Sequence, residues 1–163
     1  MILSPGLRKL ALTAHVTTSV GWIGAIAVFL GLASVGLASP DEVTVRAVYL
    51  AMEPAAGLVL MPLALSSLVT GLVLAWGTSW GLVRHYWVLF KLGINVFCVA
   101  LLWMYMETFR VLARAAADRT IDLDAVRSAS PVLHAVLALA LLLVAMVLAV
   151  YKPKGTTPFG QGG

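Results

Sequence analysis

The chain has 163 residues, of which 61% are hydrophobic and only 11% charged, and its mean hydropathy is +1.00. This composition excludes an ordinary water-soluble domain and predicts an integral membrane protein. The net charge of +4 implies no nucleic-acid partner, because basic residues that flank membrane helices face anionic lipid headgroups. The single cysteine, Cys98, excludes both a disulfide within the chain and a Cys-x-x-Cys metal site.

Four apolar runs are long enough to cross a bilayer, whose hydrocarbon core of about 30 Å needs about 20 helical residues. The first run follows two basic residues, as a secretory signal does, but it is too long for one, so we expect it to be retained. The sequence therefore predicts an all-α fold with the lipid bilayer as its partner. We expect an antiparallel bundle of four transmembrane helices within residues 1–152, at about 10–37, 43–76, 83–116 and 131–151.

Helix boundaries carry their own signals. Ser39-Pro40-Asp41-Glu42 is typical of a capping box, which predicts Ser39 as the N-cap of the second helix. Ser130-Pro131 repeats this pattern before the fourth helix, and Pro54 predicts a kink within the second. The Gly- and Pro-rich residues 153–163 predict a flexible tail.

Four crossings place both termini and the connection near residues 77–81 on one side of the membrane, which we call side A. The other side, side B, holds all seven carboxylates and as many basic flanking residues as side A. The short, acid-free flanks of side A favour a cytoplasmic location for both termini. The basic residues of side A are Arg8, Lys9, Arg84, Lys152 and Lys154.

Two polar residues interrupt the apolar runs at a similar depth below side A. His15 lies about six residues into the first run, and Lys91 lies one turn past Trp87. A polar group in a membrane costs free energy, so each needs a partner or a function. The two side chains could face each other across the bundle. Alternatively, Lys91 extends to the headgroups, and His15 makes a structural hydrogen bond to a carbonyl or hydroxyl, with Thr18 and Ser19 nearby.

Small and polar residues accompany this pair. Lys91, Asn95 and Cys98 share one face of the third helix, which suits the bundle interior. Small residues allow close helix packing, or leave room for a flat macrocycle between helices. Those of the first two helices are Gly21, Gly24, Gly31, Ser67 and Gly71.

A second polar group is expected near side B. We expect an interfacial hydrogen-bonded network there, and the alternative is a metal or second cofactor site in which His134 is a ligand. The residues of this group are Glu53, Tyr105, Glu107, Arg110 and His134. The methionines show no metal-binding spacing and are expected to pack in the core.

Four segments spread over nearly the whole chain resemble a known family. They are Ala14-His15 through Gly21-Trp22-Ile23-Gly24, Thr70-Gly71-Leu72, Tyr86-Trp87-Val88-Leu89-Phe90-Lys91-Leu92 and Tyr151-Lys152-Pro153-Lys154-Gly155. They are similar to an uncharacterised actinobacterial family of predicted integral membrane proteins within the CopD-like superfamily. This superfamily includes the copper-resistance protein CopD and HemJ, a four-helix membrane protein that binds haem b and oxidises protoporphyrinogen.

The resemblance implies a site. HemJ proteins have a helix-one histidine before a Trp-x-Gly segment and a helix-three lysine after a tryptophan, which match His15 and Lys91. It therefore implies haem b with His15 as an axial ligand, and with Lys91 either as a second iron ligand or as a cation near a propionate or a reacting porphyrin. The other residues of the implied site are Trp22, Gly24, Gly71, Trp87 and Asn95. Residues 29–35 are apolar here, where HemJ proteins carry an arginine, so the resemblance implies haem binding more directly than protoporphyrinogen oxidation.

Three functions remain open on the sequence. The first is a haem b protein of a bacterial cell membrane with a redox or porphyrin-handling role. Its partner would be a quinone or a porphyrin, and its activity that of a HemJ-like oxidoreductase. The second is a non-catalytic membrane subunit or scaffold. The third is copper handling, which one cysteine and scattered methionines favour least. A homodimer is implied by the relatives alone.

Overall fold

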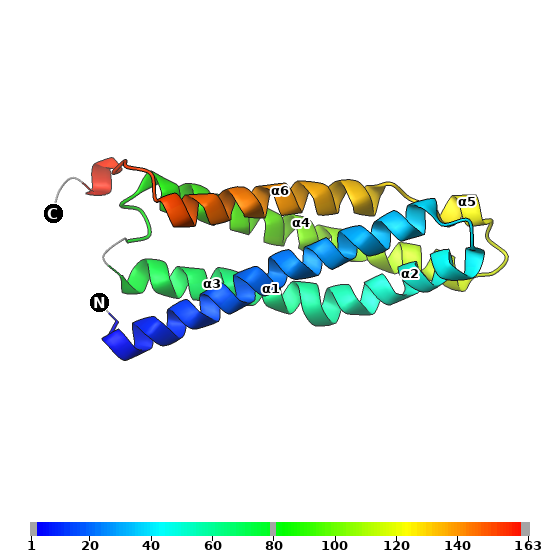
Figure 1. Cartoon of the computed structure of the whole chain (residues 1–163), viewed down its shortest axis with the longest axis horizontal. Coiled ribbons are helices and arrows are strands. Elements are labelled where there is room, and N and C mark those ends of the chain that lie inside the picture. Colours follow the sequence, from blue (N-terminus) through cyan, green and yellow to red (C-terminus); the bar gives the residue numbers. More distant parts are fainter. Residues whose placement is uncertain (1–2, 79–80, 161–163) are drawn as a thin grey trace.

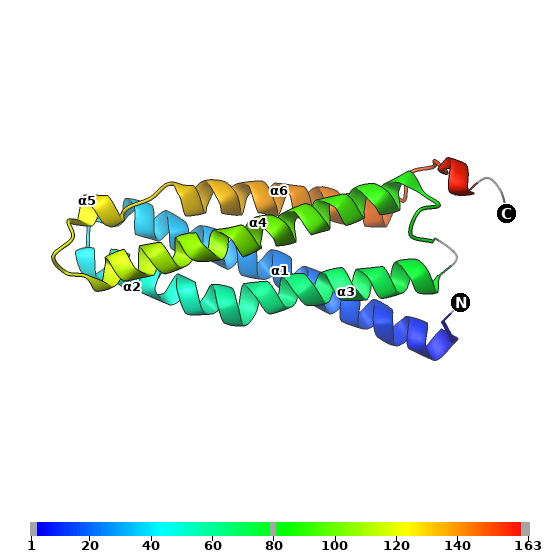
Figure 2. The same cartoon turned by 180° about the vertical axis from the view of Figure 1, so that it is seen from behind.

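The computed structural model describes residues 3–78 and 81–160 and contains four long helical spans (Figures 1 and 2). The second span is one continuous helix made of three segments. One short helix occupies the connection before the fourth span, and another lies in the C-terminal tail. In chain order the elements are α1 (Pro5–Ala38), α2 (Glu42–Ala55), the π-helix η1 (Ala56–Leu60), α3 (Met61–Gly77), α4 (Tyr86–Ala117), α5 (Leu123–Val126), α6 (Ser130–Tyr151) and the 3₁₀-helix η2 (Pro158–Gly160).

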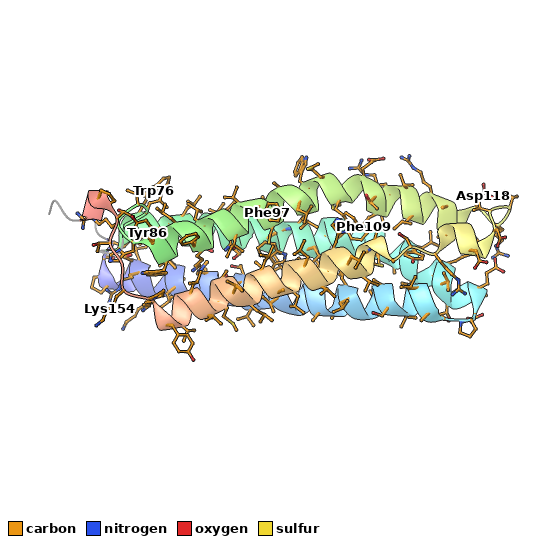
Figure 3. The ribbon with its side chains drawn as sticks, turned by 90° about the horizontal axis from the view of Figure 1, so that it is seen from above. Trp76, Tyr86, Phe97, Phe109, Asp118 and Lys154 are labelled. Atoms are coloured by element: carbon orange, nitrogen blue, oxygen red, sulfur yellow. The ribbon has the colours of Figure 1, made fainter. Side chains whose placement is uncertain are left out.

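Each span is long and apolar enough to cross a membrane, which confirms the predicted four-helix transmembrane bundle. At most 28% of the most apolar window of any span is buried inside the bundle, so most apolar side chains face outward. Trp76 and Phe97 are examples, with 66% and 52% of their surface exposed (Figure 3). This outward apolar surface suits hydrocarbon as the solvent.

Both described ends of the chain and the α3–α4 connection lie at one end of the bundle, as predicted, and this end is side A (Figures 1 and 2). α1 crosses the bundle diagonally. It packs against α3, α6 and α2, and toward side A it runs along α3 and away from α6 (Figure 1).

The second span changes its helical form after Pro54, where a kink was predicted. Proline has no N–H to donate within the helix, so one α-helical hydrogen bond is missing there. The chain continues as a π-helix over Ala56–Leu60 and returns to α-helix at Met61. A π segment of this kind keeps the backbone hydrogen-bonded inside a membrane.

The predicted N-cap of the second span was wrong. Asp41, not Ser39, is the N-cap, and its carboxylate accepts hydrogen bonds from the backbone N–H groups of Val43 (3.4 Å) and Thr44 (3.0 Å). The Thr44 hydroxyl also donates to this carboxylate, and its hydrogen bond holds the pKa of Asp41 below its ordinary value. A carboxylate is favoured over a hydroxyl here because it also interacts with the positive end of the helix dipole.

The second predicted cap was also displaced. Ser130 is the first residue of α6, and the N-cap is Ala129, whose side chain makes no capping hydrogen bond. The Ser130 hydroxyl instead accepts a hydrogen bond from Tyr105 Oη (2.9 Å). The hydroxyl is thus used between helices rather than at the helix end.

Two arginines of side B bind the carboxyl ends of helices. Arg46 of α2 is 8% exposed, and its Nε donates to Glu42 (2.8 Å). Its other nitrogens donate to the carbonyl oxygens of Ala115, Ala116, Asp118 and Ile121, at and beyond the end of α4.

Arg127 likewise donates to the carbonyl oxygens of Leu37 and Ser39 at the end of α1. Carbonyls at helix ends have no partner within the helix, so these arginines satisfy them and complement the helix dipoles.

The tail, which the sequence predicts to be flexible, makes hydrogen bonds to the α3–α4 connection over its described part. The Thr157 N–H donates to the Arg84 carbonyl oxygen (2.9 Å), and its hydroxyl donates to the Val83 carbonyl oxygen. Thr156 forms a β-bridge with His85. Residues 156–160 are thus fixed to the α3–α4 connection, whereas residues 161–163 lie outside the described part of the chain.

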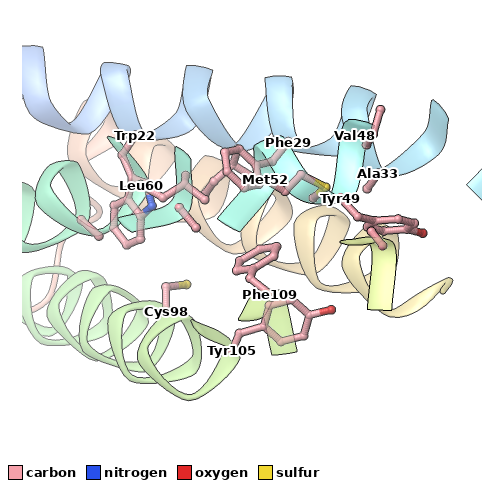
Figure 4. Packing of buried hydrophobic residues seen from close by; sticks show 14 of the residues in the cluster. Trp22, Phe29, Ala33, Val48, Tyr49, Met52, Leu60, Cys98, Tyr105 and Phe109 are labelled. Atoms are coloured by element: carbon pink, nitrogen blue, oxygen red, sulfur yellow. The ribbon is translucent and has the colours of Figure 1, made fainter. Parts of the chain in front are cut away.

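A continuous core fills the bundle between the spans. The largest fully buried side chains include Trp22 and Tyr49, and Phe109 packs edge-on against both Phe29 and Tyr105 (Figure 4). Most of this core lies at mid-bundle and toward side B. The side A half is less filled, and it holds the candidate site.

Candidate functional site

The imidazole of His15 is held by α3. Its Nδ1 lies 3.1 Å from the Ser67 carbonyl oxygen and 3.1 Å from Thr70 Oγ1. The Thr70 hydroxyl in turn donates to the Ser66 carbonyl oxygen (2.6 Å). These partners assign the ring proton to Nδ1, which donates it toward α3. Nε2 is then the nitrogen with the available lone pair.

Lys91 of α4 lies opposite that lone pair. Its Nζ is 3.1 Å from His15 Nε2, which confirms that the two residues lie at matched depth and face each other. An ammonium can only donate, so the contact agrees with a proton on Nδ1 and a bare Nε2. The lysine thus turns inward here rather than toward the headgroups. The hydrogen-bond partners of His15 Nδ1 come from α3, not from the Thr18 and Ser19 side chains of its own helix.

Gly71 makes room for the imidazole. A Cβ at this position would lie 3.1 Å from His15 Cε1 and 3.5 Å from its Nδ1, so the ring would have to shift. Gly21 similarly allows α1 to approach Leu63 of α3, where a Cβ would lie 3.3 Å from a side-chain carbon. Close approach of α1 and α3 therefore depends on these two glycines.

Gly24 does not belong to this site, contrary to expectation. A Cβ at Gly24 would meet no atom within 4 Å, and the residue is exposed on the outer face of α1. At about 100° per residue, two residues separate it from Trp22 by about 200°, so one faces outward when the other faces inward.

A cavity of about 680 Å³ lies beside the His15–Lys91 pair, and we call it the outer cavity. α1, α3, α4 and α6 form its walls, which are mostly apolar. Asn95 donates from Nδ2 to the Lys91 carbonyl oxygen (2.8 Å), so its side-chain oxygen remains an acceptor at the wall. Six of the predicted site residues line the cavity: His15, Trp22, Gly71, Trp87, Lys91 and Asn95.

Trp22 separates the outer cavity from a second one of about 60 Å³, the inner cavity, which Cys98, Tyr105 and His134 also line. Its indole is 2% exposed, and Nε1 has no hydrogen-bond partner among the described residues. Figure 4 shows the indole between α1 and the Cys98 side of α4. A buried N–H without an acceptor costs about 1–3 kcal/mol, and no sequence pattern predicted that this donor would be unpaired.

His134 belongs to a hydrogen-bonded network near side B. Its Nδ1 lies 2.8 Å from the Ser130 carbonyl oxygen, and its ring lies 4.3 Å from that of Tyr105. Arg110 and Glu107 pair separately on the exposed face of α4. Within residues 3–78 and 81–160, no group of three or more His, Cys, Asp or Glu side chains is placed to hold a metal ion. His134 therefore belongs to no such group.

Comparisons of the chain with protein families, with curated proteins and with solved structures find no match. The resemblance to the CopD-like superfamily therefore stays a prediction. The functional argument rests on the geometry of the outer cavity.

Proposed function

We propose that the chain is a membrane-embedded haem b-binding protein with a redox or porphyrin-handling role, in which His15 binds the iron. One observation supports this proposal most directly: an imidazole with one nitrogen fixed to a carbonyl and the other directed into the bundle beside a large apolar cavity. Metal-binding histidines almost always donate their second N–H in this way, because it fixes the ring and raises its basicity.

The donor set fits haem better than it fits a metal ion held by protein alone. A porphyrin supplies four ligands to its iron, so one or two side chains complete the coordination. The cavity volume lies within the range of about 300–1,000 Å³ found for cofactor pockets. Copper handling would need clustered soft ligands, whereas the described part of the chain holds no group of three or more His, Cys, Asp or Glu side chains placed to bind a metal ion.

Lys91 supports either of two roles in this proposal. As a neutral amine it is a second axial ligand, and as an ammonium it is a cation beside the porphyrin. Its contact with His15 also favours a second candidate function, a non-catalytic membrane subunit, because the two polar groups satisfy each other without a cofactor. Haem binding at His15 would require this contact to open.

A titration with haemin separates the two candidates. We expect the purified chain in neutral detergent to take up haemin with a Soret band and, after reduction, sharp α and β bands typical of haem b. A changed absorption spectrum in the Lys91→Ala variant would show that the lysine takes part in haem binding. Failure of the native chain to shift the haemin spectrum would support the subunit instead.

Gly71→Ala is expected to weaken haem retention about tenfold, because the new methyl group displaces the imidazole from its position beside Ser67. The pyridine haemochrome assay on purified variants measures this. Gly24→Ala is the matched control, since its methyl group meets no atom within 4 Å. Equal haem content in both variants would argue against a site beside Gly71.

We also propose a bacterial cell membrane as the location, with both termini in the cytoplasm. The absence of carboxylates among the flanking residues of side A supports this orientation. Accordingly, we expect a fluorescent protein fused to the C-terminus to be bright and an alkaline phosphatase fused there to be inactive. Fusions at Asp122, in the side B connection, should show the opposite pair of results. If the results at the two positions are exchanged, the termini lie outside the cytoplasm and the proposed orientation is wrong.

A further inference from the structure

The charges around the outer cavity are all of one sign. Arg8 and Lys9, near the amino end of α1, line its side A mouth together with Lys152, and Lys91 lies deeper. All seven carboxylates of the chain lie elsewhere, on the side B segments and half-spans. A cavity with basic groups and low-dielectric walls attracts anions, since the walls focus the field of the charges.

The apolar walls that α1 and α6 give to this cavity continue onto the outside of the bundle. The two helices diverge toward side A (Figure 1), and the cavity walls there include side chains that the bundle leaves exposed. These are Leu12, Val16 and Val20 of α1, and Met146 and Val150 of α6, with exposed fractions of 44–69%. An apolar wall with cations at its side A end suits a ligand that is itself amphipathic.

We propose that Arg8 and Lys9 bind the carboxylates of the porphyrin, so that the ligand enters from the side A leaflet with its carboxylates at the membrane surface. This inference rests on the proposed function and specifies its ligand as an anionic porphyrin. The apolar walls contact the macrocycle, and the two cations select for charge at its edge. Neither residue stabilises α1 through its dipole, because cations near a helix amino end are unfavourable.

The test compares haemin with haemin dimethyl ester, which keeps the ring and iron but has no carboxylates. Both are titrated by Soret absorbance into the purified full chain in neutral detergent at low salt. We expect the native chain to bind haemin about five- to tenfold more tightly than the ester, as two exposed ion pairs predict. The Arg8→Gln/Lys9→Gln variant should lose most of this preference, and added salt should reduce it in the native chain.

The control variant is Arg84→Gln/Lys154→Gln, which removes two cations from the same side but not from the cavity wall. It should keep the native preference. Equal affinities for haemin and ester in the native chain, or an unchanged preference in Arg8→Gln/Lys9→Gln, would overturn this inference while leaving haem binding intact. Displacement of haemin by micelles containing phosphatidylglycerol, lost in the same variant, would assign the cations to lipid headgroups and also overturn it. Binding of neither compound would instead contradict the proposed function.

Discussion

Replacing His15 with alanine is expected to lower haem affinity by at least about 100-fold, so that the purified variant is colourless. Loss of a supporting second-shell partner alone costs about 10- to 100-fold in metal affinity, and loss of the ligand should cost more. No other histidine lines the outer cavity within the described residues, so none can replace it. The haem content of purified protein, measured as the pyridine haemochrome, tests this prediction.

Two controls keep this result interpretable. His134→Ala removes an imidazole at the other end of the bundle, where it contacts Ser130 and Tyr105, and it should retain haem. Added imidazole should restore the spectrum of His15→Ala, since the shortened side chain leaves space for it. Haem retention at the native level in His15→Ala would show that the iron is bound elsewhere.

Replacing Arg46 with methionine is expected to destabilise the bundle by about 3 kcal/mol. The guanidinium is almost fully buried and donates to four carbonyl oxygens around the end of α4, which methionine would leave without donors. This corresponds to a fall of about 10 °C in the unfolding midpoint, by the scaling known for chains of this length. Thermal unfolding followed by circular dichroism in detergent measures it.

Arg119→Met provides the matched control, because Arg119 is exposed in the same connection and loses the same charge. Its midpoint should stay within about 1–2 °C of the native value, as for most surface substitutions. A similar fall of the unfolding midpoint in both variants would contradict this prediction. It would mean that the net charge on side B, and not the hydrogen bonds of Arg46 at the end of α4, stabilises the bundle.

The sequence predicted the spans well because the hydrocarbon thickness dictates helix length directly. It predicted helix starts less well. Asp41 is the N-cap instead of the predicted Ser39 because its carboxylate also interacts with the positive end of the helix dipole. The role of Arg46 could not be predicted, since its acceptors lie 69 to 75 residues further along the chain and depend on how α2 packs against α4.

Much of the candidate site followed from depth and helical periodicity. His15 and Lys91 were expected to meet because each lies a similar number of residues below side A, and their nitrogens are 3.1 Å apart. Gly24 was predicted from the Trp-x-Gly resemblance and the glycine pattern of the first helix, and neither says which face of α1 packs against α3. The unpartnered indole N–H of Trp22 depends on three-dimensional packing around a cavity, which no local pattern records.

The haem content of the chain as purified from cells tests the central claim most directly. The proposal predicts a red preparation whose pyridine haemochrome spectrum is that of haem b, at about one haem per chain on the single-site geometry of His15. A colourless preparation that also fails to bind added haemin would contradict the proposal, and the His15–Lys91 pair would then be a structural contact of a non-catalytic membrane subunit.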